Sequence, residues 1–121
     1  MSKRVVVTGM GVVSPIGNDV KSFWDGLVSG KNGIDKITRF DASEFKATLA
    51  AEVKDFDASE YMEKSEARKL DRFSQFALAA AAQAVSESGI TDSVKPERFG
   101  VYFGSGIGGF DTMVAEHSNL M

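Results

Sequence analysis

The chain has 121 residues, of which 43% are hydrophobic and 26% are charged, and its formal net charge at pH 7 is -3. This composition is typical of a soluble globular protein, it holds no apolar run near the ~20 residues of a membrane span, and its acidic balance argues against general binding to nucleic acid. The absence of cysteine excludes disulfides, thiolate metal sites and a cysteine nucleophile among these residues.

The N-terminus combines a basic start with a short apolar run, too short for a secretory signal, so we expect a cytoplasmic protein that does not bind a membrane. Residues 4–8, RVVVT, are β-branched and apolar, as in a parallel strand buried on both faces. Asn18 is then predicted to cap a helix whose apolar residues recur from Val20 to Val28 and which ends near Gly30.

The middle of the chain begins with a turn-rich stretch and continues with a short predicted strand at 47–53. A helical turn is expected to start at Asp57 or Ser59. The strongest helix signal covers 64–88, where alanines and long side chains dominate, and Gly89 stops it. We expect this helix to be central and buried, with small residues in its second half that allow another element to approach closely.

The last third predicts a strand at 98–103, a glycine-rich loop and a helix that starts after Gly109 and is unfinished at Met121. The alternation of strands and helices favours an α/β architecture with a mostly parallel sheet. Because the last helix has no end signal and no following strand, we expect the chain to be part of a larger protein.

The two glycine loops raise the question of a bound dinucleotide. Gly104, Gly106 and Gly109 have the G-x-G-x-x-G spacing, and Gly9 and Gly11 follow an equally apolar run. In the first loop Ser14 replaces the third glycine and the following proline lacks a backbone donor, so nucleotide binding is disfavoured there. The alternative is that these glycines permit tight turns or close backbone approaches.

Five motifs taken together resemble the N-terminal portion of the β-ketoacyl-[acyl-carrier-protein] synthases, and most closely the type II enzymes of bacterial fatty-acid synthesis. They are VVVTGMGVVSPIGN at 5–18, FW..L..GK.GI at 23–34, RFD at 39–41, RKLDRF at 68–73 and GSGIGG at 104–109. The resemblance implies the α/β thiolase-like fold, of which residues 1–121 would be a truncated N-terminal half within a five-layered α/β/α/β/α homodimer.

The resemblance also implies a decarboxylative Claisen condensation between an acyl group on an active-site cysteine and malonyl-acyl carrier protein, without a metal or other cofactor. By the family pattern the cysteine and both catalytic histidines lie beyond Met121. The chain therefore holds no catalytic residue, and His117, its only histidine, matches neither catalytic position. Taken alone, the 121 residues are expected to be inactive and to aggregate or remain partly unfolded.

Two sites can be transferred from the family. Ile107 resembles the residue whose side chain projects into the acyl pocket from the dimer interface, and Phe110 could be its neighbour in substrate binding. A buried interface isoleucine is the alternative. Lys64, Arg68, Lys69 and Arg72 form a basic run in which residues 64, 68 and 72 would share one helix face.

In the family a basic cluster at this place is part of the dock for acyl carrier protein, matched directly by Arg68 and Lys69, whereas Ser65 stands where type II enzymes can have a lysine. Because Glu63, Glu66 and Asp71 interleave with the cations, an ordinary solvated helix face is the alternative.

Two other functions remain open from the sequence. The first is a catalytically silent subunit, such as the chain-length factors of aromatic polyketide systems, which the residue at the nucleophile position beyond Met121 would distinguish. The second is a nucleotide-dependent oxidoreductase, which saturable NAD binding would support.

Overall fold

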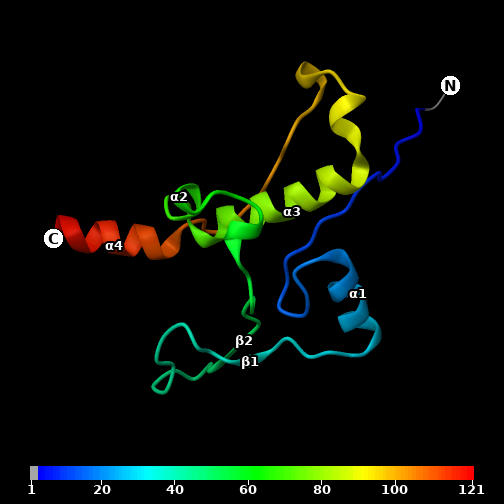
Figure 1. The fold of residues 1–121 in the computed structure, drawn as a ribbon. Helices are drawn as coiled ribbons and strands as arrows, with labels where there is room; N and C mark the ends of the chain where they lie inside the picture. Colours follow the sequence, from blue (N-terminus) through cyan, green and yellow to red (C-terminus); the bar gives the residue numbers. More distant parts are fainter. Residues whose placement is uncertain (1–2) are drawn as a thin grey trace. The chain divides into compact units, whose positions relative to one another are not determined.

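The computed structural model describes residues 3–121, which form two compact units (Figure 1). One unit consists of residues 11–56. The other consists of residues 3–10 together with residues 57–121. Among residues 3–121, no helix combines the length and the apolar character needed to cross a membrane.

The unit of residues 11–56 begins with α1, Val20–Val28, which confirms the predicted helix. Its cap is Asp19 rather than Asn18. The Asp19 carboxylate accepts a 2.8 Å hydrogen bond from the backbone N–H of Ser22, and the Ser22 hydroxyl completes a capping box. The amide of Asn18 instead donates to the carbonyl of Lys54 at 2.8 Å. Gly30, with a φ of 68°, supplies the left-handed turn after the helix.

The same unit holds the one ladder of paired strands among the described residues. Strand β1, Asp35–Lys36, pairs antiparallel with β2, Leu49–Ala50. The pairing is extended by a 3.0 Å bond from the N–H of Ile37 to the carbonyl of Thr48. The strand predicted at 47–53 is thus confirmed, although it is shorter than expected and its partner is antiparallel.

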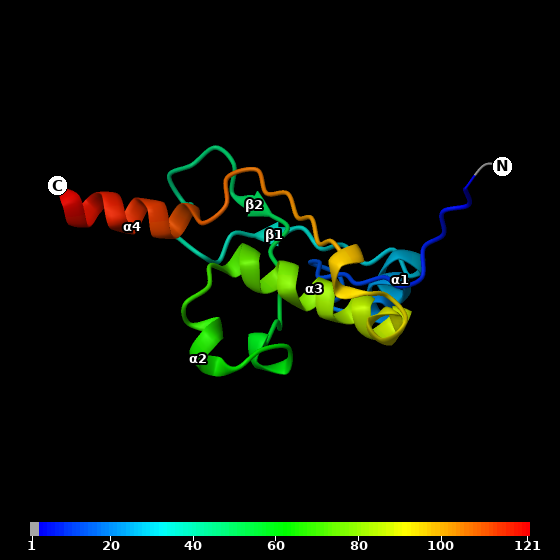
Figure 2. The same ribbon diagram turned by 90° about the horizontal axis from the view of Figure 1, so that it is seen from above.

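The second unit is helical (Figure 2). The predicted turn is confirmed as η1, Ala58–Glu60, capped by Asp57. The single helix predicted over 64–88 is wrong, because the structure contains α2, Lys64–Ala67, and a separate α3, Arg72–Ser88. Gly89 ends α3 in the left-handed conformation, as predicted. Two short helices, η2 and η3, and the final helix α4 follow, and their bounds are Ile90–Asp92, Pro96–Arg98 and Phe110–Leu120.

The strands predicted at 4–8 and 98–103 are not present among the described residues, and neither is a parallel sheet. These segments have the β-branched and aromatic residues of buried strands, but no neighbouring strand offers them a hydrogen-bonding edge. Residues 3–10 instead run to the second half of α3. A Cβ at Gly9 would overlap the carbonyl oxygen of Ala84, so this glycine permits the close approach expected at the small residues of that helix.

Burial is slight in both units. Among apolar side chains only Ala42 and Ala79 are buried in the described residues, so the expectation that the helix at α3 is central and buried is met at Ala79 alone. Val5 and Tyr102, in the two segments predicted as strands, are 93% and 95% exposed. Isolated proteins rarely expose large apolar patches, and the instability of the 121 residues alone stays a prediction.

The capping box of α1 gives a pH-dependent prediction. Hydrogen bonds from the backbone N–H and then the hydroxyl of Ser22 hold the pKa of Asp19 below its ordinary value. A carboxyl group whose pKa is lower in the folded than in the unfolded state stabilises the fold. This stabilisation is fully present above the pKa of the unfolded state, and it is lost as the pH falls through the pKa of the folded state. We expect Asp19→Ala to lower the free energy of unfolding by about 1 kcal/mol at neutral pH, and Asp19→Asn, which still caps, to cost less.

The measurement is urea unfolding of the natural gene product from pH 7 to pH 3, with Glu44→Ala as the control carboxylate in the same unit. The difference between wild type and Asp19→Ala should shrink toward the acid end of the series. Equal stability of the two proteins at neutral pH would contradict this account of α1.

Candidate functional site

The basic cluster, defined as Lys64, Arg68, Lys69 and Arg72, surrounds the joint between α2 and α3, and all four side chains are exposed. Lys64 begins α2, Arg68 caps its C-terminus, and Arg72 is the first residue of α3. The prediction that residues 64, 68 and 72 share one helix face is therefore wrong. The cluster is a corner between two helices rather than a stripe along one.

The helix predicted over 64–88 is interrupted between α2 and α3, where backbone groups form hydrogen bonds other than those of a continuous α-helix. The N–H groups of Lys69 and Leu70 tighten the end of α2 by bonding three residues back, at 2.9 and 3.2 Å. The side-chain amide of Gln75 then donates to the carbonyls of Ala67 and Leu70, at 2.8 and 3.0 Å. The Gln75 amide adds a second donor to the Ala67 carbonyl, which already accepts from the N–H of Leu70, and supplies a donor to the Leu70 carbonyl at the helix end. Gln75 thus holds the backbone on both sides of Arg68 and Lys69.

Two cations of the cluster, Lys69 and Arg72, have weak contacts with neighbouring side chains. Lys69 lies 3.4 Å from a carboxylate oxygen of Glu66, an exposed pair of the kind that contributes little to stability. The guanidinium of Arg72 lies 5.0 Å from the centre of the Phe76 ring. The Lys69–Glu66 pair is of the kind that the solvated-face alternative predicts.

A shallow depression of about 740 Å³ adjoins Lys64 and is lined by residues of η1, of α2 and of the segment 61–63 between them. The Tyr61 hydroxyl, on its rim, accepts a 3.1 Å hydrogen bond from Gln83 of α3. The hydroxyl and N–H of Ser59 hold the pKa of Asp57 below its ordinary value, with a smaller contribution from the charge of Lys64. This surface is polar and carries both signs of charge.

The glycine loop, defined as residues 104–109, lies directly before α4. The N–H of Gly108 donates to the hydroxyl of Ser105 at 3.0 Å, and Gly108 adopts a left-handed φ of 78°. Ile107 is 74% exposed and Phe110 is 54% exposed, so the two predicted substrate-binding side chains project from a loop and a helix start into open space. The turn explanation of these glycines is supported at Gly108.

The sequence reasoning missed the contact that ties this loop to α3. The hydroxyl of Thr112 donates to the carboxylate of Asp71, and a Cβ at Gly109 would overlap the same carboxylate. A Cβ at Gly108 would lie 3.7 Å from the ring of Phe73, an ordinary contact. The signal available in the sequence was Asp71 itself, a frequent helix-capping residue within a helical pattern.

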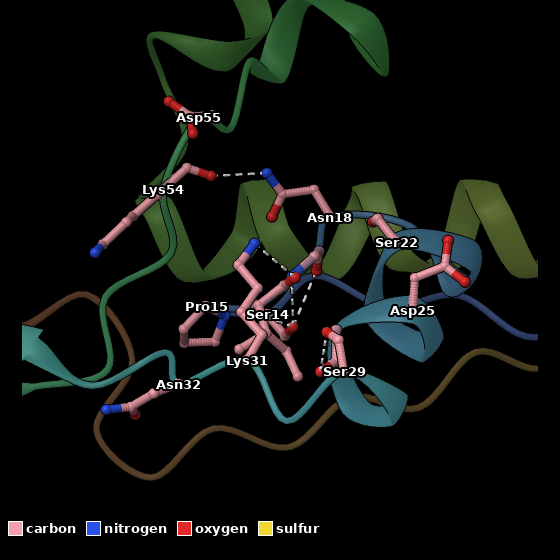
Figure 3. A pocket seen from close by; sticks show the side chains of 13 residues that line it. Ser14, Pro15, Asn18, Ser22, Asp25, Ser29, Lys31, Asn32, Lys54 and Asp55 are labelled. Atoms are coloured by element: carbon pink, nitrogen blue, oxygen red, sulfur yellow. Dashed lines mark hydrogen bonds between the residues drawn. The ribbon is translucent and has the colours of Figure 1, made fainter.

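A polar pocket of about 590 Å³ lies in the unit of residues 11–56 (Figure 3). The Ser14 hydroxyl accepts from the N–H groups of Ile16 and Gly17 at 3.3 and 3.2 Å, and Lys31 donates to the Ile16 carbonyl at 3.2 Å. Asp19 already caps α1. The amides of Ile16 and Gly17 and the start of α1 are therefore occupied by the protein's own oxygens.

No group of three or more metal-ligating side chains is found among residues 3–121. His117, near the end of α4, is exposed. The described residues therefore combine a cationic corner, a glycine loop with exposed apolar residues, and a link between them through the start of α3.

Comparison with known proteins identifies the class. Residues 2–120 match the family model for the beta-ketoacyl synthase N-terminal domain. The chain therefore belongs to the beta-ketoacyl synthase family, which confirms the resemblance predicted from the five motifs.

Two curated proteins of this family are similar to the chain over nearly its whole length. The chain is 49% identical to the 3-oxoacyl-[acyl-carrier-protein] synthase 2 of Staphylococcus aureus strain N315 over 99% of its length, and covers 29% of that protein. It is 51% identical to the protein of the same name from Vibrio harveyi over its whole length, and covers 30% of it. The chain thus spans less than a third of these curated relatives.

Two solved structures share the thiolase-like ketosynthase fold with the chain. One is the ishigamide ketosynthase/chain length factor, with a TM-score of 0.75 and 32% identity over 95% of this chain and 29% of that one. The other, AntDE:AntF, is a type II PKS acyl-carrier protein in complex with its ketosynthase bound to the hexaketide. Its TM-score is also 0.75, with 32% identity over 99% of this chain and 32% of that one.

Proposed function

We propose that the chain is the N-terminal part of a 3-oxoacyl-[acyl-carrier-protein] synthase of type II, which elongates fatty acids. The observation that carries this proposal is the 49% identity over 99% of the chain to a curated protein of that name. The proposal includes the finer features implied by the resemblance, namely the five-layered architecture, a homodimer and action in the cytoplasm.

The reaction would proceed in two steps. A cysteine thiolate takes the acyl group from the carrier protein and releases the carrier's thiol, and malonyl-carrier protein then loses CO2 to give a carbanion. The carbanion attacks the acyl thioester, and the cysteine leaves as a thiolate. Because residues 1–121 contain no cysteine, the nucleophile must come from elsewhere in the protein.

The basic cluster would contact the carrier protein. Its four cations are exposed at one corner of the chain, where they could meet an acidic protein helix and the phosphate of phosphopantetheine. The solved ketosynthase in complex with an acyl-carrier protein supports a partner of this kind. The Gln75 contacts favour the proposal, because they hold the backbone that carries Arg68 and Lys69.

Ile107 and Phe110 would contact the acyl chain. Both are apolar and largely exposed in the described residues, so they can be covered by an apolar ligand or by another part of the assembled protein. Gly106 and Gly108 flank Ile107 and give the backbone the freedom to move with the side chain.

A silent partner subunit is the second candidate, favoured by the likeness to the ishigamide ketosynthase/chain length factor. In that case the chain would contribute to a heterodimer whose other member supplies the nucleophile.

The first test is a condensation assay on the purified natural gene product. With acyl-carrier protein and malonyl-carrier protein, we expect release of CO2 and a 3-oxoacyl-carrier protein two carbons longer, detected by mass spectrometry. Activity that arises only after a separate ketosynthase subunit is added would favour the silent subunit. No product under either condition would contradict both functions.

The carrier-protein dock is tested by charge reversal. We expect Arg68→Glu and Lys69→Glu each to raise the KM for acyl-carrier protein about tenfold with little change in kcat, because like charges would then meet across the interface. The effect should weaken as salt is added. Lys46→Glu is the control, since it makes the same charge change at an exposed lysine outside the cluster. An unchanged KM in both cluster variants would contradict the dock.

The acyl contact is tested by enlarging one side chain. Ile107→Phe adds volume where the acyl chain would lie, so we expect kcat/KM for long acyl substrates to fall about tenfold while short substrates are unaffected. Leu120→Phe, at an exposed position of α4, is the control. If the substitution lowers kcat/KM equally for short and long substrates, Ile107 does not contact the acyl chain.

A further inference from the structure

Asp71 occupies the N-cap position of α3, but its side chain does not cap that helix. Its backbone carbonyl accepts the bonds from Ser74 and Gln75 that begin α3, at 2.9 and 3.1 Å, while no cap bond to α3 reaches its carboxylate. The carboxylate instead accepts from the hydroxyl of Thr112, in the first turn of α4. One aspartate therefore begins α3 with its backbone and contacts α4 with its side chain.

The start of α4 is suited to this carboxylate in two ways. The N-terminus of a helix carries a partial positive charge, which a negative side chain stabilises. Gly109 also leaves the space that the carboxylate fills, because a Cβ at that position would overlap it. Gly109 has a negative φ of -81°, so its φ alone does not require glycine. A Cβ at this position would instead force the Asp71 carboxylate out of its present place.

We propose that Asp71 is a positioning residue, which holds the glycine loop against the start of α3 through Thr112 and Gly109 and thereby sets the place of Ile107. The proposed acyl-binding loop and the proposed carrier-protein dock then share one corner of the chain, with Asp71 next to Arg72 and three residues after Arg68. Its effect on substrate choice rests on the proposed function, whereas its effect on the loop does not.

The first test needs no activity. We expect Thr112→Val, in the natural gene product, to raise the rate of amide hydrogen exchange across residues 104–112 about fivefold, the factor that corresponds to the loss of a typical hydrogen bond. Thr112→Ser keeps the hydroxyl and should restore the wild-type rate. Ser118→Ala is the control, because that hydroxyl bonds only to the Val114 carbonyl within α4. Equal exchange in the Val and Ser variants would overturn the proposal.

Substitutions at Gly109 and Asp71, made singly and together, test whether the Asp71 carboxylate is the reason for a glycine at position 109. Gly109→Ala should disturb the loop in the wild-type background, where the new Cβ meets the Asp71 carboxylate, and should be tolerated when combined with Asp71→Ala. Asp71→Asn, which keeps an acceptor for Thr112, should resemble wild type more closely than Asp71→Ala does. If Gly109→Ala raises exchange equally in both backgrounds, Asp71 is not what that glycine accommodates and the proposal fails.

Kinetics separate this inference from the function on which it rests. In an active protein, Asp71→Ala and Thr112→Val should alter the ratio of kcat/KM for long and short acyl chains by at least about threefold. Thr112→Val, which changes no charge, should leave unchanged the KM for carrier protein, the property assigned to Arg68 and Lys69. An active protein with an unchanged ratio overturns the positioning role. An inactive wild-type protein overturns the proposed function and leaves the exchange results to decide the contact.

Discussion

The end of α2 at Ala67 and the restart of the helix at Arg72 determine the arrangement of residues 57–121. A continuous helix would place the basic residues in one stripe and would give Asp71 no reason to face α4. The break turns the backbone carbonyls of Ala67 and Leu70 to Gln75 and frees the Asp71 carboxylate for Thr112. Two polar side chains at the start of α3 thus act on the two features: Gln75 holds the backbone of the cationic corner, and Asp71 contacts the helix that follows the glycine loop.

The two segments predicted as strands are exposed for another reason, the lack of neighbouring strands and covering layers. Residues 4–8 and 98–103 have the composition of buried strands, yet Val7 and Phe103 are 81% and 60% exposed. A parallel sheet needs neighbours on its edges and layers on both faces. In the proposed synthase, the parts of the protein beyond the described residues would supply those neighbours, and the strand propensity of these segments would then be satisfied by tertiary contacts rather than by local ones.

The sequence predicted features that depend on neighbours along the chain, such as α1, the turn at Asp57, the stop at Gly89 and the start of α4. Prediction from the sequence failed where the local structure depends on a residue far away along the chain. Helix propensity over 64–88 was overridden by the Gln75 side chain, which binds the carbonyls of Ala67 and Leu70, and the contact of Asp71 with Thr112 joins residues 41 positions apart. The strand propensity of 4–8 and 98–103 had no partner strand. The five motifs identified the family, because a family pattern carries long-range information that propensity lacks.

In the proposed synthase, the chain would form part of a condensing enzyme whose nucleophile lies outside these 121 residues. The most direct test is the intact mass of the natural gene product before and after incubation with acyl-carrier protein. The account predicts a protein several times heavier than 13.0 kDa that gains one acyl group on a cysteine beyond Met121. A product of 13.0 kDa that gains no acyl group would contradict it, and the nucleophile would then have to be sought on a partner chain.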